Sequence, residues 1–263
     1  MSRAQPLATI GLIRPARTRG FCPACRLFLD GDTRQEIGAP ALTVLAFLIL
    51  AVLGWVLTIA RSGAMDDMSM GAGDFGQFAV SWSLMIVAMM LPSATPLVFE
   101  FADHAERRRN WVAATALLAM TYLGVWLAFG VVCYVVLNAL GMPWPNQQLV
   151  GGAAPVAAGV YAFTPLKRAS EARCRELCAL HGPLPFNLLR SAVVSGGRYG
   201  LSCLGCTGGV MVAMLLVGLS SLTWMIVLTA ILLVYKIAPA PRRWTLPVSA
   251  LLIVLGVVYA AVA

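Results

Sequence analysis

Long apolar runs separated by short polar segments define the pattern of this chain. A helix needs roughly 20 apolar residues to cross a bilayer core of about 30 Å. The longest run, residues 201–235, exceeds one span and is divided at Ser220-Ser221. The pattern predicts an all-α, polytopic transmembrane helical bundle with about seven spans, at residues 41–60, 77–99, 111–140, 149–166, 201–219, 222–238 and 245–263.

The first 40 residues differ from the rest because they are polar and rich in arginine. They lack the early apolar core of a secretory signal peptide. The sequence therefore predicts a cytoplasmic N-terminal extension, residues 1–40, ahead of a transmembrane domain, residues 41–263. The extension contains the CxxC pair Cys22 and Cys25. Without a thioredoxin-like pattern around it, this pair is not indicated as a redox motif, and metal capture or no role both stay open.

The charges give the predicted bundle an orientation. With the N-terminus inside, 18 of the 19 basic residues fall in inner segments, and Arg61 is the exception. Cytoplasmic segments of membrane proteins carry such an excess of Lys and Arg. We therefore expect a cytoplasmic N-terminus and an outside C-terminus. Topology accounts for the net charge of +8, so nucleic acid binding is not required.

Composition supports a membrane location and limits the chemistry. Hydrophobic residues make up 60% of the chain and charged residues 11%, too much apolar surface for a soluble domain of this length. The sequence holds no P-loop, HExxH or GxSxG motif, so we predict that the protein is not an enzyme. No charged residue lies near the middle of a predicted span, which disfavours a proton-coupled pump.

A methionine cluster occupies the predicted outer loop before the second span. Met65, Met68 and Met70 surround the carboxylates Asp66 and Asp67. Thioethers are soft ligands that favour Cu(I), and they remain ligands in an oxidising compartment where thiols would form disulfides. The loop is a candidate for metal capture, and a polar loop with incidental methionines is the alternative.

The second span contains further methionines close to two prolines. Met85 and Met89 share one helix face, Met90 follows, and Pro92 and Pro96 each remove a backbone donor. One interpretation is a kinked helix that places thioethers beside free carbonyls along a soft-metal route. The other is a packing kink in which methionine fills gaps.

The strongest candidate ligands lie in and after the polar segment that follows the fourth span. Cys174, Cys178 and His181 form one stripe of a helix, and Cys203 and Cys206 follow. Two close cysteine pairs in a reducing compartment more often bind metal than form a disulfide. Cu(I) would need two or three thiolates, and Zn(II) four N or S ligands. The alternative is that these thiols are buried as small hydrophobic groups.

Four motifs in this order resemble a bacterial family of predicted metal-binding integral membrane proteins, domain of unknown function 2182 (DUF2182). They are Met89-Met-Leu-Pro-Ser93, Thr164-Pro-Leu-Lys167, Cys174-Arg175 and Gly200-Leu-Ser-Cys-Leu-Gly-Cys206. The resemblance covers roughly residues 41–240. It implies a metal site and a place in the bacterial inner (cytoplasmic) membrane.

This chain departs from that family at two positions. The family usually has a cysteine where this chain has Ser170, and often a second of two adjacent cysteines where it has Thr207. Two thiols that the resemblance leads us to expect are therefore absent.

These observations favour a protein that binds or handles a soft metal ion, with copper as the first choice. The Met loop would capture the ion, the Met-rich span would line its route, and the cysteines would bind it inside. Its partners would be the lipid bilayer, the metal ion, and a membrane complex or metallochaperone. The alternatives are a non-catalytic assembly protein with a structural zinc site, and a small-solute transporter.

Overall fold

The computed structural model describes residues 39–61, 75–141, 147–178, 187–217, 226, 229–230 and 241–262. In these segments the chain forms helices and no strand, so the predicted all-α class is confirmed. The helices are α2 (Ala39–Ala60), α4 (Phe75–Ala105), α5 (Trp111–Ala139), α6 (Gln147–Tyr161), α7 (Pro165–Cys178), α8 (Leu188–Val217) and α10 (Pro241–Val262). The predicted span at 222–238 lies almost wholly outside the described residues.

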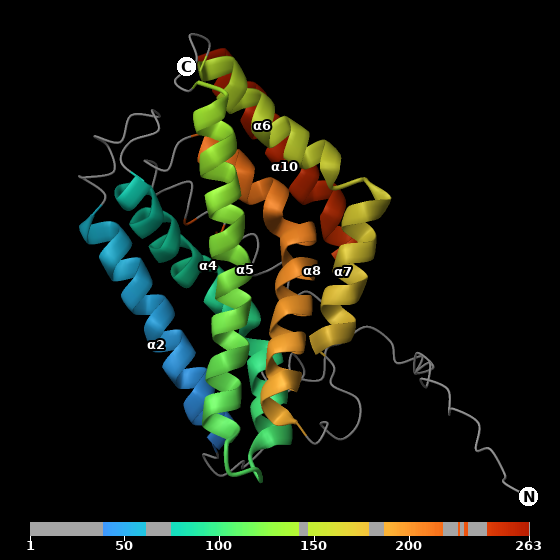
Figure 1. Ribbon diagram of the computed structural model, residues 1–263. Helices are drawn as coiled ribbons and strands as arrows, with labels where there is room; N and C mark the ends of the chain where they lie inside the picture. The colour runs from blue at the N-terminus through green and yellow to red at the C-terminus, as the bar shows by residue number, and fades with distance from the viewer. Residues whose placement is uncertain are drawn as a thin grey trace, which may run out of the picture.

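Helices α4, α5 and α8 form the centre of the bundle (Figure 1). A short turn joins α4 to α5, and Trp82 of α4 donates a hydrogen bond to the Trp126 carbonyl of α5 at 3.0 Å. Helices α5 and α8 run in the same direction. Gly196 lies against Leu118, and Gly200, one turn later in α8, lies against Val125, which is also later in α5. A Cβ at Gly196 would lie 2.5 Å from the Leu118 carbonyl oxygen, so glycine is what permits this close approach.

The proline-containing segment of α4 is helical throughout, and two carbonyls near the prolines have hydrogen-bond partners. The Met90 carbonyl accepts from the Ser93 hydroxyl at 2.7 Å and from Tyr122 at 3.3 Å. The Ser93 carbonyl accepts from Tyr199 at 2.9 Å. Tyr122 of α5 and Tyr199 of α8 thus add polar contacts from two other helices to the proline-containing segment of α4. The carbonyls that lose their amide donors to Pro92 and Pro96 are those of Ala88 and Pro92, four residues earlier. The interpretation with free carbonyls therefore stays a prediction.

The polar segment after the fourth predicted span contains α7, which carries Cys174 and Cys178 of the predicted helical stripe. It also contains the start of α8, which the sequence pattern did not predict. Helix α6 ends at Tyr161, before the predicted limit of 166, and Thr164 then caps α7 by accepting the Lys167 amide at 3.4 Å. Pro165 suits the first position of α7 because its missing amide donor is not needed there. Asn187 caps α8 in the same way, through the Arg190 amide at 3.2 Å.

Helix α8 therefore begins at Leu188 instead of residue 201, the predicted start of the fifth span. Residues 188–200 were assigned to a polar segment because they include Arg190 and Arg198. Both arginines are exposed, whereas Ala192 and Tyr199 are buried against the bundle. The helix is amphipathic in this half, and its apolar side packs against α5.

Within the segments that the structure describes, four helices are long and apolar enough to cross a membrane, namely α2, α4, α5 and α8. Two shorter apolar stretches, Val150–Tyr161 and Pro247–Val258, belong to α6 and α10, which lie side by side (Figure 1). Helix α2 turns most of its apolar side chains outward, including Leu42, Ile49 and Val52, each more than half exposed. The buried core lies instead between α4, α5 and α8.

Candidate metal centre

Two cysteines, one from α7 and one from α8, converge on Cys206. Its thiol interacts with those of Cys203, one turn earlier in α8, and Cys174 of α7. Its Sγ also donates to the Cys203 carbonyl at 3.2 Å. Cys174, Cys203 and Cys206, which we call the cysteine cluster, are all buried, with exposed fractions of 8%, 0% and 8%. The two cysteine pairs predicted from the sequence are thus brought together through one member of the first and both of the second.

Helix α7 supplies its cysteine from a face that carries polar groups inward. Lys167 and Cys174 are buried, and Ser170 and Glu171 are half-buried, at the i, i+3, i+4, i+7 spacing of one helix stripe. The opposite face exposes arginines. Ser170 packs so closely on Gly205 that a side chain there would meet the serine hydroxyl. Glycine at position 205 therefore lets α7 approach α8 beside the cysteines.

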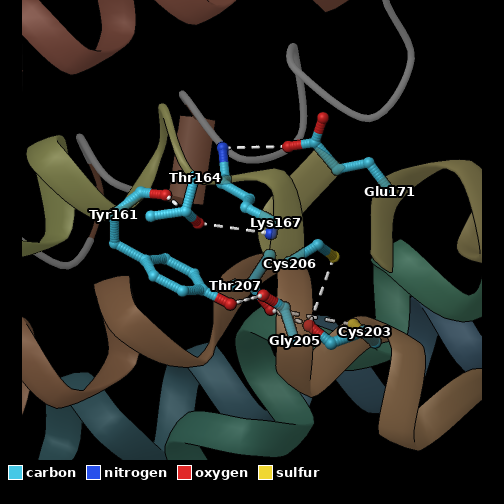
Figure 2. Close-up of polar contacts among 8 residues, drawn as sticks. All are labelled: Tyr161, Thr164, Lys167, Glu171, Cys203, Gly205, Cys206 and Thr207. Carbon is cyan, nitrogen blue, oxygen red and sulfur yellow. Dashed lines mark hydrogen bonds and ion pairs between the residues drawn. The ribbon is translucent and has the colours of Figure 1, made fainter. Parts of the chain in front are cut away.

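An ion pair and a tyrosine lie beside the cysteine cluster (Figure 2). The Lys167 ammonium is 2.9 Å from the Glu171 carboxylate, and their side chains are 10% and 17% exposed. Tyr161 of α6 donates to the Gly205 carbonyl at 2.7 Å and lies within electrostatic range of Cys206 and Glu171. Charged side chains are rarely buried unless they are paired, so the ion pair allows both charges to lie largely buried beside the cysteine cluster.

Two hydroxyl groups contact Cys203 from different helices. The Tyr122 hydroxyl of α5 is 3.4 Å from its Sγ, and the Thr207 hydroxyl of α8 is 3.7 Å from it. Thr207 donates to the Cys203 carbonyl at 2.8 Å. Tyr122 was not predicted from the sequence as a site residue. The available signal was a polar atom in the middle of a long apolar helix, which needs a partner from another helix.

The methionines predicted in the second span are all buried. Met85, Met89 and Met90 have exposed fractions of 1%, 4% and 1% and belong to the same contiguous core as the cysteine cluster. Helix α8 adds Met211 and Met214 to this core, with exposed fractions of 0% and 5%, and the sequence analysis missed both. Their i, i+3 spacing in an apolar helix was the signal that could have found them.

Several candidate ligands are not placed by the structure. Met65, Met68, Met70, His181 and the Cys22–Cys25 pair lie outside the described residues. Cys178 is the last residue of α7, and its side chain is also outside the description. The lone Cys133 is buried in α5, as expected of a packing residue. The ring nitrogen Nδ1 of His104 is hydrogen-bonded to the Glu100 carbonyl of the same helix.

The described residues contain no group of three or more His, Cys, Asp or Glu already arranged to hold a metal ion. The cysteine cluster is therefore a set of interacting thiols that would have to reorient around an ion. Its donor set suits a soft metal, because thiolates are the soft ligands that select Cu(I). A tetrahedral zinc site would need a fourth ligand in addition to these three sulfurs.

Fold and site together define a class: an all-helical bundle with apolar outer helices around a buried group of thiols and thioethers. The chain belongs to the copper chaperone family PpoB2, whose profile matches residues 79–259. The match includes the cysteine cluster and all the buried methionines of α4 and α8. Membership of a copper chaperone family favours copper handling and a non-catalytic protein. No curated protein matches the chain. No solved structure matches it.

Proposed function

We propose that this protein is an integral membrane protein that binds Cu(I) through Cys174, Cys203 and Cys206. The carrying observation is the interaction of the Cys206 thiol with cysteines of both α7 and α8. These residues are 32 positions apart in the sequence, so the fold, and not local spacing, brings them together. Two or three thiolates suffice for Cu(I), and the family of the chain is described as a copper chaperone.

The membrane location is supported by the outward face of the bundle. Leucine, isoleucine and valine side chains of α2 and α5 are exposed along most of both helices. A soluble protein rarely exposes contiguous apolar surface of this extent, whereas lipid accepts it. The positive-inside pattern supports an orientation in which the N-terminus and the arginines of α7 face the cytoplasm. The membrane would be the bacterial inner membrane. Seven spans and an outside C-terminus are part of this proposal.

The depth of the cysteine cluster follows from the charges of the helices around it. In α8 the arginines end at Arg198, and no charged residue follows up to Val217. In α4 the first charged residue is Glu100. Cys203 thus lies where the charged part of the bundle meets its uncharged part, at the cytoplasmic border of the membrane. A bound ion would be reachable from a cytoplasmic metallochaperone or a partner membrane complex.

The methionines provide the rest of the proposed route. Met65, Met68 and Met70 would receive the ion outside, and Met85, Met89 and Met90 would pass it toward the cysteine cluster. Cys178 and His181 would serve as further ligands at the cytoplasmic end. Thiolates bind Cu(I) more strongly than thioethers, so transfer toward the cysteines is downhill.

Anaerobic titration of the full chain with Cu(I) in detergent tests the proposal. We expect uptake at low micromolar metal by the wild type. We expect its loss in a variant with Cys174, Cys203 and Cys206 changed to Ser. Cys133→Ser is the matched control, because Cys133 is equally buried but lies in α5, outside the cysteine cluster. No uptake by the wild type, or uptake unchanged in the triple variant, would refute the proposal, and tightly held zinc without copper would favour the structural-zinc alternative.

A further inference from the structure

The hydroxyl of Tyr122 lies where three helices meet. Tyr122 belongs to α5 and is 1% exposed. Its oxygen is 3.3 Å from the Met90 carbonyl and 3.4 Å from the Ser93 hydroxyl, both of α4. It is also 3.4 Å from the Cys203 Sγ of α8. One hydroxyl proton therefore has acceptors on both the proline-containing helix and the cysteine cluster.

The Met90 carbonyl does not depend on Tyr122 alone. The Ser93 hydroxyl donates to it at 2.7 Å, a shorter contact than the 3.3 Å from Tyr122. A buried carbonyl that loses its last hydrogen-bond donor lowers the stability of the fold, whereas a carbonyl that keeps one donor avoids most of this cost. The tyrosine proton can therefore leave this carbonyl without creating an unsatisfied buried group.

The sulfur of Cys203 changes as an acceptor when it binds metal. A neutral thiol is a weak acceptor, whereas a sulfur that binds a metal as thiolate keeps negative charge. Hydrogen bonds to charged acceptors are roughly twice as strong as neutral ones. In a site from which water is excluded, the Tyr122 hydroxyl at 3.4 Å lies closer to that charge than the Thr207 hydroxyl at 3.7 Å, and it comes from another helix.

We propose that Tyr122 is a positioning residue for the metal-bound form, which turns its hydroxyl from the Met90 carbonyl to the Cys203 sulfur when Cu(I) binds. This inference rests on the proposed function. It adds a donor outside the ligand set, of the kind that orients and tunes metal ligands in other proteins. It also links metal binding in α8 to the proline-containing segment of α4, because the Met90 carbonyl exchanges one of its donors.

Tyr122→Phe removes the hydroxyl and keeps the ring that packs on Tyr199, whose centroid is 5.6 Å away. In competition titrations of the full chain with a chromogenic Cu(I) chelator, we expect its affinity to fall roughly ten-fold to a hundred-fold. We also expect the sulfur-to-copper charge-transfer band to shift, because the thiolate loses a hydrogen bond. A purely structural role would leave the band position unchanged.

Tyr199→Phe is the matched control, because its hydroxyl is equally buried and donates to a carbonyl of α4 at 2.9 Å. We expect it to keep the affinity within about two-fold, since no charge-assisted bond is lost, and to keep the wild-type band. Ser93→Ala gives an independent test, since it removes the competing Ser93 hydroxyl from the Met90 carbonyl and so favours the Tyr122 hydrogen bond to this carbonyl. It should weaken Cu(I) binding several-fold while leaving Tyr122 in place.

Two results would overturn the inference while leaving the proposed function intact. One is wild-type affinity and band position in Tyr122→Phe. The other is equal weakening of the Tyr122→Phe and Tyr199→Phe variants with no band shift. If the wild type takes up no Cu(I), the proposed function fails, and the inference that rests on it fails too.

Discussion

The cysteine cluster and the buried methionines of α4 are both groups of hidden sulfur atoms, yet their surroundings differ. Around the cysteines lie hydroxyl groups, a carbonyl that accepts a hydrogen bond from a thiol, and the Lys167–Glu171 ion pair. The side chains of Met85, Met89 and Met90 belong to the same contiguous core, where leucine, phenylalanine and tryptophan side chains are also buried. Polar partners can compensate a thiolate or a bound cation, whereas an apolar core favours neutral packing. The comparison supports our proposal that the cysteines would hold the ion and that the methionines would only conduct it.

The largest expected effect is that of Cys206→Ser, since Cys206 joins the other two thiols. Loss of an outer partner of a metal ligand typically costs ten-fold to a hundred-fold in affinity, so we expect loss of this ligand to exceed roughly a hundred-fold. Chelator competition measures it. Cys133→Ser should retain wild-type affinity, and a Cys206→Ser variant that did the same would place the ion elsewhere.

A change at Gly205 should weaken the site without touching a sulfur atom. An added methyl group would meet the Ser170 hydroxyl and push α7, with Cys174, away from α8. We expect Gly205→Ala to lower Cu(I) affinity roughly ten-fold and Ser170→Gly to restore part of it. Gly124→Ala is the control, because its Cβ would meet nothing within 4 Å. Equal affinities in all these variants would show that close contact between α7 and α8 is not needed.

The ion pair beside the cysteine cluster should contribute to stability more than to binding. Glu171→Gln leaves the Lys167 ammonium, whose side chain is 10% exposed, without its carboxylate partner. Since both groups keep some contact with solvent, we expect a loss of about 1 kcal/mol in unfolding free energy. Thermal unfolding in detergent measures it against Glu176→Gln, which alters an exposed residue of the same helix. Identical melting of the two variants would contradict this role.

Substitution of the buried methionines of α4 should have the smallest effect on the equilibrium affinity for Cu(I). A variant with Met85, Met89 and Met90 changed to Leu should bind Cu(I) at equilibrium with wild-type affinity. Each exchange should cost less than about 1.5 kcal/mol in stability, because leucine nearly conserves the volume. The rate at which Cu(I) added outside reaches the cysteine cluster, measured by stopped flow in proteoliposomes, should decrease. Met211→Leu is the control, and a large loss of equilibrium affinity in the triple variant would make the methionines ligands of the resting ion.

Helices with uniform chemistry were predictable from the sequence. Helix α2 was expected at 41–60 and is found at 39–60, and α5 was expected at 111–140 and is found at 111–139. Each is an apolar run of bilayer length bounded by polar residues, so the pattern leaves little choice. Helix α7 was expected only as the helical stripe of Cys174, Cys178 and His181, and the first half of α8 was missed because it carries the exposed arginines Arg190 and Arg198. A hydropathy pattern cannot distinguish such residues from a solvated segment.

The candidate site was predictable in its residue types but not in its contacts. The spacing of Cys203 and Cys206 indicated one pair, and the helical stripe of Cys174, Cys178 and His181 indicated the other candidates. The role of Gly205 as a contact for α7, and that of Tyr122 as a neighbour of Cys203, depend on how α5, α7 and α8 pack together. Those contacts join residues far apart in the chain, and periodicity carries no information about them.

Copper K-edge X-ray absorption of the full chain, loaded anaerobically with one equivalent of Cu(I), tests the central claim most directly. Sulfur ligands from α7 and α8 around one ion predict a coordination shell of two or three sulfur atoms. They also predict that this shell changes when Cys174 or Cys206 becomes Ser. A shell of nitrogen or oxygen atoms, or a sulfur shell that is the same in both variants, would contradict the account.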